Sequence, residues 1–305
     1  MQEDYLPDHA PLWAYLKLAE KYYNEDRLDV AMKVVEDAFK DAGWPSGDWS
    51  QFFNNLTCEK DARDSALVRK VDSLLSIEID RGAGDSLCAS LGDAAVEARR
   101  FAGAELKVEF ARPAMVTIFR PDAPIQFIQG PYGYVTHKTE IDKICLPWIY
   151  SQHNDIALHA LRHEFVHVAV HELAGEDTAK WLNEGLASYL AKDFERAPAL
   201  FSEASEALGG GEVSMERVED VLSTPSLRGG EETAVREAYY LASTFIAYWV
   251  SCYTLDSVRE VLVRLAQDED PAHAIHHVTG TSLDEMERQW ANAMLNSTGT
   301  NQTNE

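Results

Sequence analysis

The segment Leu158–Lys192 reads LHALRHEFVHVAVHELAGEDTAKWLNEGLASYLAK and contains the pattern His-Glu-x-x-His in an apolar, helix-prone context. Its two histidines, His163 and His167, are four residues apart. Residues at this spacing project from the same face of a helix, so both imidazoles can bind one tetrahedral metal ion such as Zn²⁺. Glu164 lies beside that face, where its carboxylate can take a proton from a metal-activated water.

A third protein ligand is required nearby, and Glu184 is the candidate. The helix with the histidines is expected to run to about Ala174 and to end at Gly175. From His167 to Ala174 the helix rises about 10 Å, and from Ala179 back to Glu184 the next helix rises about 8 Å. An antiparallel return of the chain therefore brings Glu184 level with the histidines.

Each histidine taken singly is typical of a hydrogen-bonded core residue. The face they share continues with apolar residues, however, and burying two imidazoles without a partner is costly. Metal ligation is therefore favoured for both His163 and His167. His171 follows at the same spacing, but each four-residue step turns the helix by about 40°. We therefore expect it to be exposed or hydrogen-bonded and not a ligand.

In these residues the chain resembles the gluzincin metallopeptidases, and in particular the bacterial peptidase MA-like group. The resemblance rests on His163–His167 together with WLNEGLASY, residues Trp181–Tyr189. It extends more weakly from about Leu106 to Leu295. The resemblance implies a thermolysin-like catalytic domain that hydrolyses peptide bonds with one Zn²⁺ per chain. The Gly-Ala-Met-Glu-Asn segment of aminopeptidases is absent from the sequence, which makes an endopeptidase or limited-proteolysis enzyme the default.

The resemblance also implies further site residues. Ser188, one helical turn after Glu184, stands where gluzincins often place a residue that orients a ligating histidine. Tyr239, in a segment similar to a downstream family helix, is the candidate stabiliser of the oxyanion, and Tyr240 is the reserve. Buried aromatic residues at helical spacing are more usually core, so this alternative stays open for Tyr239.

Composition limits the classes of partner. The chain has 305 residues, 46% of them hydrophobic and 26% charged, with a net charge of −24. These values are typical of a globular protein, and the negative charge argues against nucleic acid or an anionic membrane as partner. The N-terminus shows no signal peptide, no apolar run reaches the length of a membrane span, and the four cysteines are scattered. We therefore expect a cytoplasmic protein with reduced thiols.

The pattern of apolar residues predicts an α+β fold with a helical N-terminal region (1–103), a gluzincin-like domain (104–295) and a disordered tail (296–305). Residues 10–42 predict a helical hairpin with the apolar positions of a tetratricopeptide repeat. Two interpretations stay open: a hairpin docked on the catalytic domain, which is favoured, or a surface for a protein partner. Further helices are expected at 59–80, 92–103, 196–207, 214–223, 233–252, 255–268, 270–278 and 282–295.

A small mixed sheet is predicted just before the histidine helix. Its strands are expected at 106–110, 115–119, 126–128, 133–137 and 143–147, because these runs are rich in β-branched and apolar residues and are separated by proline and glycine. In gluzincins such a sheet covers the histidine helix, and its edge strand pairs with the substrate peptide. The resemblance therefore implies that residues 130–143 form the peptide-binding rim.

Two hypotheses of different class follow from the sequence. The leading one is a zinc metallopeptidase in which Glu164 activates water. The alternative is a catalytically weak interaction or regulatory module that keeps zinc for structure, because serine at position 188 orients a histidine less strongly than a carboxylate does. Ligand types alone do not separate zinc from cobalt or manganese, although two histidines and one glutamate favour zinc.

Overall fold

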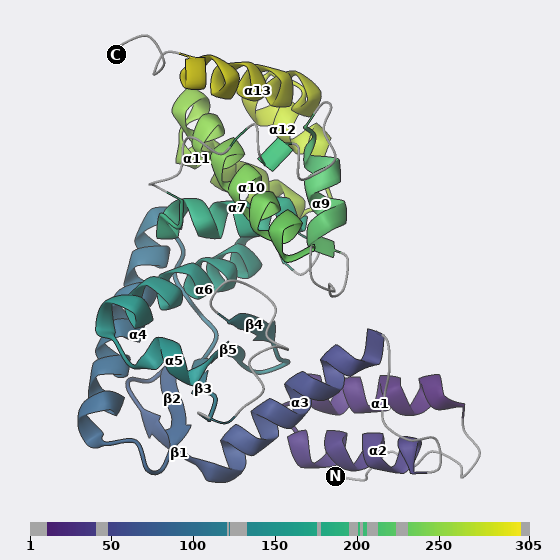
Figure 1. The fold of residues 1–305 in the computed structure, drawn as a ribbon, viewed down its shortest axis with the longest axis vertical. Coiled ribbons are helices and arrows are strands. Elements are labelled where there is room, and N and C mark those ends of the chain that lie inside the picture. The colour runs from purple at the N-terminus through teal and green to yellow at the C-terminus, as the bar shows by residue number, and fades with distance from the viewer. Residues whose placement is uncertain are drawn as a thin grey trace. The chain divides into compact units, whose positions relative to one another are not determined.

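The computed structural model describes residues 11–40, 48–120, 122, 133–175, 178–194, 201, 204–205, 213–223 and 231–299 (Figure 1). It confirms the α+β class, with many helices and one five-stranded mixed sheet. The chain divides into two compact units, the first formed by residues 1–98 and 111–164 and the second by residues 99–110 and 165–305. Two continuous helices, α4 (Asp85–Leu106) and α6 (Asn154–Ala174), contribute residues to both units.

The first unit contains the sheet, whose strand order is β1-β2-β3-β5-β4. The strands β2, β3 and β5 pair in parallel, and β1 and β4 are added antiparallel at the two ends. Every residue of β5 is buried, which is expected for a strand with neighbours on both sides. The bounds are β1 (Ala66–Lys70), β2 (Leu75–Asp80), β3 (Ala114–Ile118), β4 (Tyr134–His137) and β5 (Asp142–Leu146).

The N-terminal helices belong to the same unit. The predicted hairpin is confirmed as α1 (Leu12–Asn24) and α2 (Leu28–Phe39), which pack on each other and on α3 (Asp48–Ser65). Their apolar faces meet in one cluster of buried residues: Ala19, Tyr22, Tyr23, Leu28, Ala31, Val35 and Leu56. Because α3 also packs on β1, β2 and β3, the hairpin and the sheet share one folded unit. The short helix α5 (Trp148–Ser151) follows β5.

The second unit is helical in the part that the structure describes. Its core is formed by α7 (Lys180–Ala191) packed along α10 (Glu231–Tyr253). The two backbones are very close at Gly185, where a Cβ atom would lie 2.8 Å from the carbonyl oxygen of Ala242. The remaining helices are α9 (Met215–Ser223), α11 (Leu255–Leu265), α12 (Pro271–Thr279) and α13 (Leu283–Gly299). None of the described helices is long and apolar enough to cross a membrane.

Two predicted elements are wrong. The helix expected over 59–80 ends at Ser65, and the chain continues as the antiparallel pair β1 and β2. In β2 the sequence Leu-Ser-Ile-Glu-Ile-Asp alternates at the period of a strand. The strand expected over 106–110 is absent, because α4 continues to Leu106 and ends where Lys107 adopts a left-handed conformation with φ 53°.

The predicted boundaries also change. Strands β1 and β2 come from the region expected to be a separate helical part, yet they join the same sheet as β3 and β5. Residues 1–103 therefore do not form a unit of their own. Helix α13 continues to Gly299, so residues 296–299 of the predicted tail are helical. The predicted strand 126–128, most of the predicted helix 196–207 and residues 300–305 lie outside the described residues.

Candidate metal centre

Helix α6 presents the His-Glu-x-x-His residues as the spacing predicts. His163, Glu164 and His167 are buried, with 1%, 2% and 8% of their surface exposed. The helix ends at Gly175, which adopts φ +80° and whose N–H donates to the carbonyl oxygen of His171 at 2.9 Å. The predicted end of this helix is therefore confirmed, and the two histidines lie one turn apart on one continuous element.

Helix α7 brings Glu184 to His167. The carboxylate oxygen Oε2 of Glu184 lies 3.3 Å from Nε2 of His167. One ligand atom from each of His163, His167 and Glu184 lies within 4.8 Å of the other two. Ligands around a single tetrahedral zinc, at metal–ligand distances of about 2 Å, stand within about 4 Å of one another. The donor set and its spacing therefore fit a zinc ion after small side-chain adjustments.

Asn183 orients one of the histidines, a role that the sequence argument missed. The amide oxygen Oδ1 of Asn183 lies 2.8 Å from Nδ1 of His167. Because an amide oxygen only accepts, the contact keeps the proton on Nδ1 and leaves the lone pair of Nε2 for a metal. The sequence could have indicated this role, because Asn183 directly precedes Glu184. One turn of α7 then carries both a candidate ligand and a group that orients one.

Ser188 does not take the orienting role that the resemblance implied. Its side chain is fully buried, but Oγ makes no hydrogen bond with any residue in the described part of the chain. Ser188 is instead among the residues that line a cavity of about 410 Å³ in the second unit, together with Phe101, Phe194 and Thr244. In this structure the hydrogen-bonded support for His167 comes from Asn183.

The two tyrosines of α10 differ in burial. Tyr239 is half-buried, whereas Tyr240 is 2% exposed and its ring packs edge-on against Phe194 at 5.6 Å between centroids. Burial, and to a smaller extent the nearby Glu237, raises the pKa of Tyr240 above its usual value. A neutral phenol that can donate a hydrogen bond is what an oxyanion needs. Both tyrosines stay candidates for that role.

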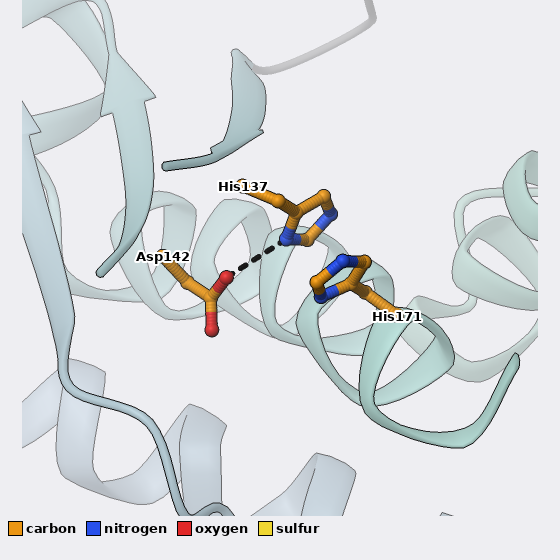
Figure 2. Close-up of side chains that lie close together, drawn as sticks. All are labelled: His137, Asp142 and His171. Atoms are coloured by element: carbon orange, nitrogen blue, oxygen red, sulfur yellow. Dashed lines mark hydrogen bonds and ion pairs between the residues drawn. The ribbon is translucent and has the colours of Figure 1, made fainter. Parts of the chain in front are cut away.

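A second group of side chains has ligand atoms within 4.8 Å of one another, namely His137, Asp142 and His171 (Figure 2). Figure 2 shows His137 and Asp142 joined by the hydrogen bond between Nδ1 and Oδ1, which measures 2.9 Å. Arg112 Nε also lies 3.6 Å from Oδ2 of Asp142. A guanidinium competes with a metal for this carboxylate, so His163, His167 and Glu184 are the better candidate ligand set.

The candidate centre is partly exposed to solvent. The side chain of Glu184 is 21% exposed, while that of His167 is 9% exposed. Structural zinc sites normally use four protein ligands, whereas catalytic sites use three and keep one position for water or substrate. Three candidate ligands with partial exposure at Glu184 match the second kind of site.

No protein-family model matches the chain, and no curated protein matches it.

Proposed function

We propose that this protein is a zinc-dependent peptidase of the gluzincin type, most simply an endopeptidase or limited-proteolysis enzyme. The observation that carries the proposal is the grouping of His163, His167 and Glu184, with ligand atoms within 4.8 Å of one another. Two imidazoles and one carboxylate are the ligand set of hydrolytic zinc enzymes. When bound there, zinc lowers the pKa of a coordinated water and polarises the substrate carbonyl.

Glu164 is the proposed general base. It is adjacent to His163 on α6 and 2% exposed, so its carboxylate is shielded from bulk water. The carboxylate accepts a proton from the attacking water and then delivers it to the nitrogen of the departing amine. This cycle leaves Glu164 ionised at the end of each turnover, and it needs no covalent bond between the enzyme and the peptide.

Asn183 and a tyrosine of α10 have further proposed roles. Asn183 holds His167 in the tautomer that binds metal. A phenol from α10 supplies a hydrogen bond to the oxyanion that forms when the carbonyl is attacked, with Tyr239 as the first candidate and Tyr240 as the second.

Peptide recognition is proposed at strand β4. Among the strands that the structure describes, β4 is at one end of the sheet and pairs only with β5. An edge strand can add an extended peptide through main-chain hydrogen bonds, with little selectivity for side chains. This suits cleavage in extended segments of a protein substrate.

The proposal is tested by replacing Glu164 with glutamine. The variant keeps the size of the side chain but removes the base, so we expect it to bind zinc like the wild type and to hydrolyse a peptide library at least about 100-fold more slowly. Cleavage is followed by mass spectrometry, and zinc is measured in the same samples. Glu172→Gln, on the same helix, is the matched control and should retain activity.

Two outcomes would contradict the proposal. Hydrolysis by Glu164→Gln at the wild-type rate would remove the assigned base. A wild-type protein that binds zinc but cleaves no peptide in the library would favour the alternative of a zinc-containing interaction module.

A further inference from the structure

The first unit buries a cluster of charges away from the metal centre. Glu59 of α3 and Lys143 of β5 are fully buried, and Lys138, which directly follows β4, is 1% exposed. Side chains of this kind are almost never fully buried unless they are paired. All three are nevertheless buried close to β4, the strand at one end of the sheet, so each must have a charged or hydrogen-bonded partner there.

Glu59 is the centre of this cluster. Its Oε2 atom lies 3.2 Å from Nζ of Lys138 and 3.1 Å from Nζ of Lys143. Its Oε1 atom accepts a hydrogen bond from the hydroxyl of Tyr134 at 3.1 Å and another from the hydroxyl of Tyr23. One carboxylate of α3 thus joins α1, β4, β5 and the turn between the two strands.

The backbone makes a second connection to the same hairpin of strands. The N–H of Thr139, in the turn between β4 and β5, donates to the carbonyl oxygen of Asn24 at the end of α1, at 2.7 Å. The side chain of Arg112 donates to the carbonyl oxygen of Lys138. The N-terminal helices therefore contact β4 at both ends. They bind its first residue, Tyr134, and the turn that follows its last residue, His137.

The charges make this attachment costly. Burial lowers the pKa of Lys138 to about 8, even though Glu59 acts in the opposite direction. Burial acts to raise the pKa of Glu59, but the charges of Lys143 and Lys138 and the hydrogen bond from Tyr23 together outweigh it, so this pKa lies below its ordinary value. Apolar side chains of similar size are often at least as stabilising as a buried ion pair, whereas removing one partner is strongly destabilising. We therefore look for the role of this cluster in fixing how the strands are arranged and not in a gain of overall stability.

We propose that Glu59 is a positioning residue, through which the N-terminal helices α1 and α3 hold the edge strand β4 in the geometry that accepts a peptide. The peptide-binding role of β4 rests on the proposed function, but the mechanical link between Glu59 and β4 does not. The helical hairpin is then an internal support of the substrate-binding edge, and its loss weakens peptide binding without changing the reacting groups.

Hydrogen exchange in Glu59→Gln tests the mechanical link. Glutamine keeps the shape of the side chain but removes the carboxylate that the two buried lysines share. Lys138 then faces a neutral amide, whereas Lys143 keeps Glu78 of β2, whose Oε2 lies 3.4 Å from its Nζ. We expect the amides of residues 134–146 to exchange about tenfold faster or more, while β1, at the other end of the sheet, changes by less than about twofold. Glu36→Gln, an exposed position on α2, is the control and should leave both regions unchanged.

Tyr23→Phe extends the test in case Glu59→Gln does not fold. It removes one hydroxyl donor to Glu59 and retains every charge, so we expect a smaller increase in exchange confined to residues 134–146. Equal acceleration at β1 and at β4–β5 in either folded variant would make Glu59 a general stabilising residue and would overturn the proposal. Unchanged exchange at β4 in Tyr23→Phe and in a folded Glu59→Gln would overturn it as well.

Kinetics separate positioning from catalysis. In whichever variant folds, we expect the KM for a peptide substrate to rise, by about tenfold for Glu59→Gln, and kcat to stay within about twofold of wild type. A fall in kcat at unchanged KM would contradict the assigned role. If the wild type cleaves no peptide, the proposed function fails, while the exchange experiment still decides whether Glu59 positions β4.

Discussion

At the scale of single residues, the metal centre depends on which ring nitrogen of His167 carries the proton. Asn183 Oδ1 lies 2.8 Å from Nδ1, and Glu184 Oε2 lies 3.3 Å from Nε2. Both contacts come from consecutive residues of α7, so one short segment sets the tautomer and supplies a ligand. The geometry of this candidate site therefore depends on Asn183, which is not itself one of the candidate ligands.

Replacing Asn183 should weaken zinc binding without abolishing it. We expect Asn183→Ala to lower zinc affinity by about 10- to 100-fold, the usual effect of removing a group that orients a ligating histidine. Asn183→Asp keeps an acceptor oxygen and should stay closer to wild type. Competition with a chelator of known affinity measures both. Equal zinc affinities for wild type and Asn183→Ala would show that this contact does not support the metal centre.

At the scale of helices and strands, the position of Glu184 depends on how closely α7 approaches α10. A Cβ atom at Gly185 would lie 2.8 Å from the carbonyl oxygen of Ala242. This oxygen belongs to the backbone, so it cannot move away by a change of rotamer. Trp181 of α7 also packs edge-on against Phe245 of α10, with 5.6 Å between the ring centroids. The candidate ligand Glu184 therefore lies on α7, which can approach α10 this closely only because Gly185 has no side chain.

Adding a methyl group at this contact should destabilise the second unit. We expect Gly185→Ala to lower the free energy of unfolding by about 1–3 kcal/mol, the usual effect of overpacking. Gly92→Ala in α4 is the matched control, since its Cβ would meet only the side chain of Val71, at 3.4 Å, and alanine favours helix. Urea unfolding of metal-free protein measures both. A Gly185→Ala protein as stable as Gly92→Ala would contradict the close packing.

The sequence predicts the helices around the site better than it predicts the sheet. Helix α6 has a regular period and a glycine after its last residue, so its end follows from local chemistry. The sequence does not predict the pair β1 and β2, because the apolar residues from Ala66 to Ile77 also fit helical spacing. The alternation over residues 75–80 is a local signal for a strand, and pairing of β2 with β1 and β3 fixes it. The ion cluster of Glu59 joins residues distant in sequence, so no local pattern contains it.

At the scale of the whole chain, the two units are built from interleaved parts of the sequence. The first unit takes residues 1–98 and 111–164, so the N-terminal helices and the sheet form one body. The sequence suggested a boundary near residue 103, because composition changes there from helix-forming to strand-forming residues. The boundary differs because strand pairing joins β2 to β3 across α4, and such pairing is a property of the folded chain.

The metal content of the purified protein tests the central claim most directly. The grouping of His163, His167 and Glu184 predicts about one zinc per wild-type chain. It also predicts that His167→Ala and Glu184→Ala both lose the metal, while Glu172→Gln on the same helix as the histidines retains it. Elemental analysis of folded, dialysed samples gives the answer. A wild-type protein without zinc after incubation with the metal, or variants that keep it, would contradict the assignment of this site.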